Sequence, residues 1–231
     1  MAFALIDDAT GTSPDTEIVT SGAIDSTGAN LLVSGLGSSW NTKPFFDSKS
    51  NTWSQVRSEL ENFDFDRQAS IAWSTPTSVG SGHTGSHGQA LSSNYQAIVF
   101  AAFSGAAASS PEDQTADDYI SSTESIQAGS ITPTEANELI IAVLCSRSDV
   151  EVSIDSGFTI IAQIPASESP QYRAVAMAYK IQTSAEAVNP TWSWTGAHAA
   201  VAIIHSFKAG AGGGGGGGNP WHHYAQMRRA A

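Results

Sequence analysis

Short apolar runs that alternate with polar residues recur along this chain, and Gly, Pro, Asn, Asp or Ser clusters bound each of them. Side chains on a strand point alternately to opposite faces, so this two-residue period indicates half-buried β-strands. Helical spacing is absent apart from a short turn at 134–137. The pattern predicts an all-β protein, a two-sheet sandwich or a barrel. The expected strands are 31–36, 52–60, 69–74, 96–103, 138–145, 158–164, 173–182, 191–194 and 199–207.

The two halves of the chain resemble each other in sequence. An offset of 107 residues relates three pairs, Ile24 and Ile131, Asn30 and Asn137, and Leu32 and Leu139. Asp47–Trp53 is echoed by Asp155–Thr159, and Arg67–Trp73 is echoed by Arg173–Tyr179. We expect an N-terminal extension at 1–20 and pseudo-repeats at about 21–105 and 128–209. Each repeat could form its own small sandwich; we favour one shared sandwich, because no Pro/Gly linker separates the repeats.

Seven consecutive glycines, Gly212–Gly218, precede a short aromatic and basic C-terminal peptide. Glycine loses much backbone entropy on ordering and buries no side chain, so we interpret 210–218 as a linker. Trp, Tyr, Met and Arg are enriched at protein interfaces. We therefore predict that 219–231 anchors the chain to a partner, a free end being the alternative. The predicted docking residues are Trp221, His222, His223, Tyr224, Met227, Arg228 and Arg229.

The net charge is −12, and the residues before the glycine run carry −14 because Arg228 and Arg229 lie beyond it. So acidic a body, without a basic stripe, argues against nucleic-acid binding. The lone Cys145 excludes an intrachain disulfide and is expected in the core. The first residues lack the features of a signal peptide, and no apolar run has membrane-spanning length, so we expect synthesis in a cytoplasm without membrane insertion.

Two polar groups invite a metal hypothesis. His83 and His87 lie four residues apart in a Gly/Ser-rich stretch, but without a helix or a third ligand we expect a solvated loop rather than a zinc site. Four acidic residues follow Pro111 without the spacing of a calcium-binding loop, and we expect a solvated connector. They are Glu112, Asp113, Asp117 and Asp118.

Carboxylates and tryptophans allow two carbohydrate hypotheses. Paired acids could hydrolyse glycosides, and the chain offers Glu59, Glu61, Asp64 and Asp66. Trp192 and Trp194 share one strand face and could form a glycan platform, although core packing is the favoured alternative. Trp40, Trp53 and Trp73 are further aromatic candidates. Nucleophile-elbow, phosphate-loop, Cys-x-x-Cys and dinucleotide motifs are absent. We expect no enzyme activity, no cofactor and no metal.

One further set of local signals carries a resemblance. The set consists of 47–53, Ala72-Trp73, Phe103-Ser104-Gly105, Ile131-Thr132, 136–139, Gly157-Phe158-Thr159, Ala178-Tyr179-Lys180, Thr191-Trp192-Ser193 and Phe207-Lys208. In this order the signals resemble jelly-roll β-sandwich modules of phage and prophage structural proteins and of bacterial surface proteins, over about 20–209. These motifs mark strand ends and turns, and they carry no catalytic residues.

The resemblance implies a jelly-roll-like sandwich in the virion of a tailed bacteriophage. Such a protein would serve as a tail-tip, fibre or capsid decoration protein that contacts other virion structural proteins. By analogy it would be a homo-oligomer, for which a trimer is our expectation. The alternative is a carbohydrate-binding module for host attachment through a surface glycan. A glycosidase is the third hypothesis.

Overall fold

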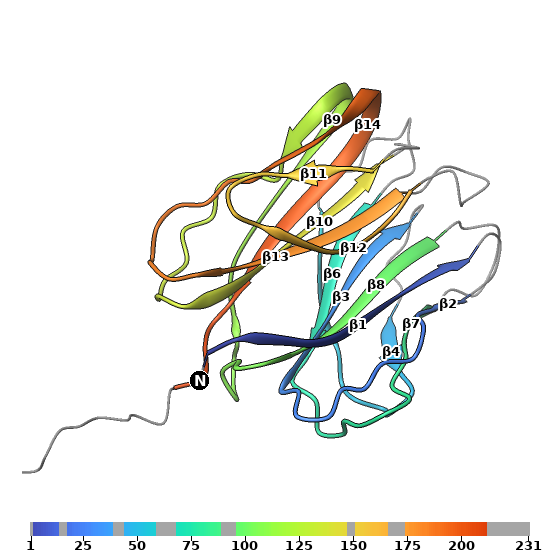
Figure 1. The fold of residues 1–231 in the computed structure, drawn as a ribbon, viewed down its shortest axis with the longest axis vertical. Helices are drawn as coiled ribbons and strands as arrows, with labels where there is room; N and C mark the ends of the chain where they lie inside the picture. Colours follow the sequence, from blue (N-terminus) through green and yellow to red (C-terminus); the bar gives the residue numbers. More distant parts are fainter. Residues whose placement is uncertain are drawn as a thin grey trace, which may run out of the picture.

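The computed structural model describes residues 2–13, 18–38, 44–58, 68–88, 96–146, 151–165 and 174–211. Every regular element in these ranges is a β-strand. Two large antiparallel sheets pack face to face, and a small third sheet lies outside the first (Figure 1). The predicted all-β class and two-sheet sandwich are therefore confirmed, while the jelly-roll comparison stays a prediction.

The first large sheet has the strand order β1–β8–β3–β6–β5. Its strands are β1 (Ala4–Ser13), β3 (Leu31–Ser38), β5 (Ser54–Arg57), β6 (Gln68–Ser74) and β8 (Gln96–Ser104). The expectation of an N-terminal extension at 1–20 is wrong for β1, which pairs along the whole of β8 from Ala4↔Ser104 to Ser13↔Gln96. Periodicity missed β1 because it is an edge strand with few apolar side chains.

The second large sheet is built around β14 and β10. Its strands are β9 (Glu112–Gln127), β10 (Glu138–Ser146), β11 (Ser153–Ile154), β12 (Thr159–Ile164), β13 (Ala174–Gln182) and β14 (Thr191–Phe207). The two runs expected at 191–194 and 199–207 form the single strand β14. The acidic stretch after Pro111, expected to be a loop, is the edge strand β9 and pairs with β14.

A three-stranded sheet covers the outer face of the first large sheet. It consists of β2 (Ile18–Thr20), β7 (Gly85–Gly88) and β4 (Phe45–Asp47), in the order β2–β7–β4. Val19 and Phe45 from this layer pack on Leu36, Ala72 and Ile98 of the large sheet. The first sheet is consequently buried on both faces, which explains why every residue of β3 is buried.

The two halves have the same strand order when β1 is matched with β9, β8 with β14, β3 with β10, β6 with β13 and β5 with β12. The register corrects one sequence match. Leu31 pairs with Phe103, and Leu139 pairs with Phe207. Leu139 therefore corresponds to Leu31 and not to Leu32. The extra residue is accommodated before β10, where Asn137 adopts a left-handed φ of 66°.

The sheets share one hydrophobic core, to which both halves contribute. Leu31, Val33, Leu139 and Ile141 belong to the same buried cluster, together with the predicted core residue Cys145. A cluster that contains residues of both repeats is the arrangement expected of one sandwich rather than of two separate ones.

Chain entry, chain exit and the connection between the halves lie at one end of the sandwich. Gly210 N donates to Gly105 O at 2.7 Å, and a Cβ on Gly105 would lie 2.5 Å from Ala2 O. At the opposite end β1, β3 and β10 finish at Ser13, Ser38 and Ser146. Figure 1 shows the N-terminus beside the chain exit, away from those strand ends.

Gly35, on the inner face of β3, lets the two sheets approach closely. A Cβ there would lie 2.8 Å from Cγ2 of Val143 and 3.1 Å from Sδ of Met177. We expect Gly35→Ala to lower the free energy of unfolding by about 1–3 kcal/mol through overpacking. The cost should be smaller in a Val143→Ala background, where the clash is relieved. Urea unfolding of the four proteins of this cycle measures both values; equal costs in both backgrounds would contradict the packing argument.

Candidate functional site

Asp47, at the end of β4, is the centre of a buried polar cluster in the first half. Its Oδ1 accepts hydrogen bonds from Lys49 N at 2.8 Å and Asn51 N at 3.1 Å. Its Oδ2 accepts from Asn51 Nδ2 at 3.0 Å and Trp53 Nε1 at 2.8 Å. Burial alone raises the pKa of Asp47, but these four bonds outweigh it and hold the pKa below its usual value. The carboxylate is therefore fixed as an anion that organises the turn after β4.

Ser26, His83 and Asp47 form an arrangement that superficially resembles a hydrolase triad. Ser26 Oγ lies 2.7 Å from His83 Nδ1, and His83 Nε2 lies 3.5 Å from Asp47 Oδ2. The second distance is too long for a good hydrogen bond. Ser26 and His83 are both 0 % exposed, and Ser26 Oγ also accepts from Gly80 N at 3.0 Å. A nucleophile must reach its substrate, so this trio holds the segment at Gly80 against Ser26 instead.

The two histidines of the predicted loop are buried, so the expectation of a solvated loop is wrong. His83 is bridged to Ile24 just before β7, and His87 lies on β7 with Nδ1 2.7 Å from Gln96 Oε1. Burial lowers the pKa of His83, although Asp47 opposes the shift. Across the described ranges no group of three His, Cys, Asp or Glu side chains has the geometry of a metal site.

A second polar cluster surrounds Asp113 at the start of β9, near the chain exit. Asp113 accepts hydrogen bonds from Thr134 N at 2.7 Å and Thr134 Oγ1 at 2.9 Å, and lies 3.3 Å from Lys208 Nζ. Burial opposes ionisation of Asp113, but these partners lower its pKa. This carboxylate joins β9 to the turn before β10 and to the end of β14.

Glu138, the first residue of β10, is 0 % exposed. It accepts a hydrogen bond from Glu135 N at 3.0 Å. Burial raises its pKa, and Asp113 raises it further. Two carboxyl groups with opposite pKa shifts are a pattern used in acid–base catalysis. Here Glu138 is inaccessible to a substrate, so the pair favours a structural role.

His205 is a buried histidine on the inner face of β14. It pairs with Ile141 of the neighbouring strand β10, and its ring centroid lies 4.7 Å from that of Phe207. The residue is 3 % exposed, and neither ring nitrogen has a hydrogen-bond partner among the described residues. Burial lowers its pKa to about 4. The equivalent position of the first half is occupied by Ala101, so the fold itself does not require a histidine here.

The tryptophans proposed as a glycan platform are largely buried, although Trp194 lines an open depression of about 440 Å³ together with Glu151 and Ser153. Trp192 is 0 % exposed and Trp194 is 7 % exposed. Both belong to the cluster on the outer face of the second sheet, where they pack with residues such as Ile140 and Ile204. The glycan-platform prediction is wrong for Trp192, because burial removes the ring faces that a sugar would stack on.

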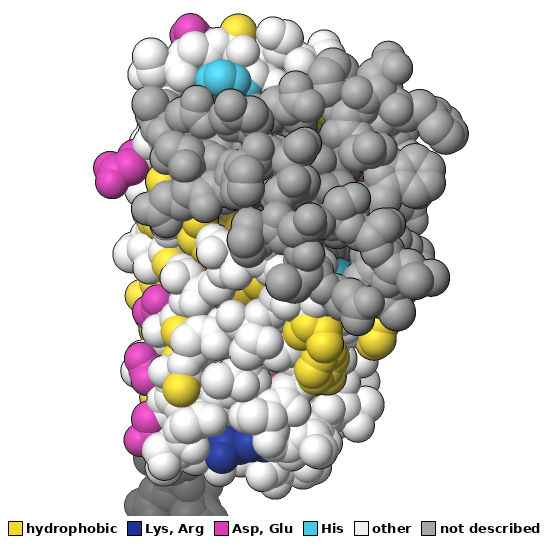
Figure 2. All heavy atoms as spheres, turned by 90° about the vertical axis from the view of Figure 1, so that its right-hand side faces the viewer, with side chains coloured by type: hydrophobic (Ala, Val, Ile, Leu, Met, Phe, Trp, Pro, Cys, Tyr) yellow, Lys and Arg dark blue, Asp and Glu magenta, His cyan; other side chains and the backbone are white. Residues whose placement is uncertain are grey.

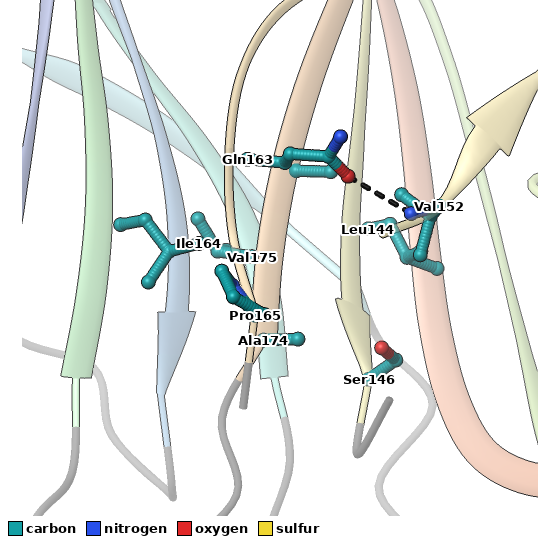
Figure 3. A pocket seen from close by; sticks show the side chains of 9 residues that line it. Leu144, Ser146, Val152, Gln163, Ile164, Pro165, Ala174 and Val175 are labelled. Atoms are coloured by element: carbon teal, nitrogen blue, oxygen red, sulfur yellow. Dashed lines mark hydrogen bonds between the residues drawn. The ribbon is translucent and has the colours of Figure 1, made fainter. Parts of the chain in front are cut away.

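A small gap lies beside Ser146, between residues of β10, β12 and β13 (Figure 3). It has a volume of about 10 Å³. Val152 N donates to Gln163 Oε1 at 2.9 Å across one side of it. Ser146, Ile164 and Val175 also line it. The gap has room for one water molecule at most, so it does not serve as a ligand pocket.

Several predicted site residues lie outside the described ranges. They are Trp40, Glu59, Glu61, Asp64, Asp66 and the docking residues Trp221, His222, His223, Tyr224, Met227, Arg228 and Arg229. Conversely, sequence reasoning missed Ser26, Asn51, Glu138 and His205. A lone histidine inside the apolar run 199–207 was a usable signal for His205. The Ser26–His83 contact carries no sequence signal, because 57 residues separate its members.

Comparison with known proteins returned no matching family model, no similar curated protein and no similar solved structure. In the described part of the chain no helix is long and apolar enough to cross a membrane. The function of this chain is therefore inferred from its geometry and its sequence.

The buried His205 predicts a loss of stability in acid. Its pKa is about 4 in the folded protein and about 6.5 in the unfolded chain. The unfolded state therefore binds a proton first as the pH falls, and stability present above pH 6.5 declines towards pH 4, by about 3 kcal/mol. Unfolding titrations at several pH values across this window should show that the free energy of unfolding depends less steeply on pH in His205→Leu than in the unchanged protein. His198→Gln, at a partly buried histidine of the same strand, is the control; an unchanged slope for His205→Leu contradicts the assignment.

The buried Asp47 cluster predicts a large stability effect without a catalytic one. Asp47→Ala removes the acceptor of four hydrogen bonds and leaves buried donors unpaired, so we expect a loss of about 3 kcal/mol. The matched control is Asp155→Ala, since Asp155 is exposed and accepts from Thr191 N at 2.7 Å. It should cost about 1 kcal/mol or less. Comparable losses in the free energy of unfolding for both variants, measured by urea unfolding, would show that the buried cluster contributes no more than an exposed hydrogen bond.

Proposed function

We propose that this chain is a non-enzymatic structural protein of a tailed-phage virion. It would form part of a tail tip or fibre, or decorate a capsid. In this proposal the β-sandwich is displayed outward and 219–231 binds a neighbouring subunit. The jelly-roll-like relationship and the oligomeric, trimeric state belong to the same proposal.

The observation that carries this proposal is that the chain enters and leaves the sandwich at the same end. The last strand ends at Phe207, and Gly210 pairs with Gly105 beside the chain entry. The glycine run follows directly from that end. The strand ends at Ser13, Ser38 and Ser146 lie at the opposite end. A body that continues into the glycine run at one end and leaves the opposite end clear of that attachment suits display on a larger assembly.

The polar clusters support a structural role rather than a reaction. Several residues of these clusters are 0 % exposed; they are Ser26, His83 and Glu138. Their hydrogen bonds can stabilise the fold, but their side chains cannot contact a substrate. The carbohydrate-binding alternative loses Trp192 through burial. The open depression beside Trp194 is the described feature that it would have to use.

The proposal predicts that the C-terminal peptide is needed for assembly. Replacing 219–231 with a Gly/Ser sequence of equal length should reduce incorporation of the protein into particles at least about tenfold, since aromatic and arginine anchors commonly dominate binding. Quantitative mass spectrometry of purified virions measures the incorporation. The control replaces Ala230 and Ala231 alone and should leave it unchanged. Normal incorporation without the aromatic and basic residues would refute the docking proposal.

A further inference from the structure

The three-stranded sheet carries an exposed apolar pair on its outer surface. Ile18 on β2 is 47 % exposed and Phe46 on β4 is 40 % exposed. Gly88 on β7 lies between them, because its Cβ would be 2.9 Å from Phe46 Cε1 and 3.8 Å from Ile18 Cγ1. We call Ile18, Phe46 and Gly88 the outer apolar patch. Figure 2 shows hydrophobic side chains exposed on the side of the molecule that faces right in Figure 1.

The second half shows that the fold does not require this patch. Val19↔His87 in the first half corresponds to Ile126↔Trp192 in the second, since the bridges Ile24↔His83 and Ile131↔Val188 lie at the same spacing from each pair.

With this register Ile18 corresponds to Ser125 and Gly88 to Ser193, which pair with each other in the second half. Phe45↔His87 corresponds to Ile154↔Trp192, so Phe46 corresponds to Asp155, one residue away from the sequence match of Asp47 with Asp155. The N–H of Asp155 donates to Thr191 O at 3.2 Å. The same scaffold position is therefore polar in one half and apolar in the other. Exposed apolar groups that the fold does not need point to a binding role.

We infer that the outer apolar patch receives the C-terminal peptide 219–231 of a neighbouring copy of this chain. This inference rests on the proposed docking function and names its acceptor. Trp221 and Tyr224 lie three residues apart, with Met227 three further on. Aromatic side chains at this spacing fall on one face of a helical turn, and one of them can stack on the Phe46 ring over Gly88.

Charge and reach agree with this occupant. The peptide carries Arg228 and Arg229 and no acid, whereas the residues before the glycine run carry −14. Opposite net charges favour encounter between the peptide and another copy. The segment 212–220 has an extended length of roughly 30 Å at about 3.3–3.6 Å per residue. At full extension such a segment could reach a surface up to roughly 30 Å from Ala211.

Photo-crosslinking of the full-length protein tests the inference. Trp221 is replaced by p-benzoylphenylalanine, and equal amounts of ¹⁴N- and ¹⁵N-labelled protein are mixed before irradiation. We expect cross-links between isotopically different chains, from position 221 to peptides that contain Ile18 or Phe46. The double variant Ile18→Ser/Phe46→Asp, which copies the polar residues of the second half, should lower their yield roughly tenfold.

The matched control is Ile6→Ser/Val79→Ser, at side chains that are 37 % and 38 % exposed elsewhere on the surface; it should keep the cross-link yield. Thermal unfolding checks that each variant is folded. If the double variant does not fold, Ile18→Ser alone replaces it, with the same expected direction. Cross-links that map elsewhere, that join only chains of the same isotope, or that survive loss of the patch overturn the inference.

Particle incorporation separates this inference from the function on which it rests. If replacement of 219–231 leaves incorporation unchanged, the docking function fails and the inference fails with it. If that replacement blocks incorporation while Ile18→Ser/Phe46→Asp incorporates normally, only the acceptor assignment is wrong.

Discussion

The close contact between two similar sheets is the constraint on which the remaining structure depends. At the middle of β3, Gly35 and Gly37 leave room for side chains of the opposite sheet. A Cβ on Gly37 would lie 2.8 Å from Val175 Cγ2 and 3.0 Å from Cys145 Sγ. Side chains of the second sheet therefore pack directly against the backbone of β3 at these two glycines. Both repeats must be present to complete this core.

The outer faces of the two large sheets are covered in different ways in the two halves. In the first half, separate strands β2, β7 and β4 form an outer layer that buries the Asp47 cluster. In the second half, β9 and β14 continue through the equivalent region as single long strands, and the tryptophans at 192 and 194 fill the space beneath. One half thus relies on buried hydrogen bonds and the other on aromatic packing. The apolar outer patch at Ile18 and Phe46 is a feature of the first half alone.

The functional proposal follows from where polar and apolar groups are placed. His205 and Glu138 are held in the interior, where burial shifts their pKa values away from the charged form. The surface of the described residues includes an acidic strand, β9, and an apolar pair on β2 and β4. An acidic edge strand resists unwanted strand pairing, whereas the apolar pair is suited to a specific contact.

Local sequence was sufficient for the fold class and for most central strands. Residues 31–36, 96–103 and 138–145 are apolar because these strands are buried on both faces, so their signal survives without knowledge of neighbours. The matching Arg67–Trp73 and Arg173–Tyr179 segments also revealed the repetition. Edge strands such as β1 and β9 gave a weak signal, because one side faces water and few apolar side chains are needed.

Burial of polar residues was decided by long-range packing. His83 and His87 were interpreted as loop residues in the sequence. In the structure His87 lies on β7 between the distant strands β2 and β4, and the His83 ring packs against Phe100 of β8. The one-residue shift between Leu32 and Leu139 was likewise invisible, because strand register depends on the cross-strand partner. Whether a serine, a histidine or a tryptophan is accessible depends on which distant segments cover it. Composition and residue spacing do not predict this burial, because it arises only when the two sheets pack together.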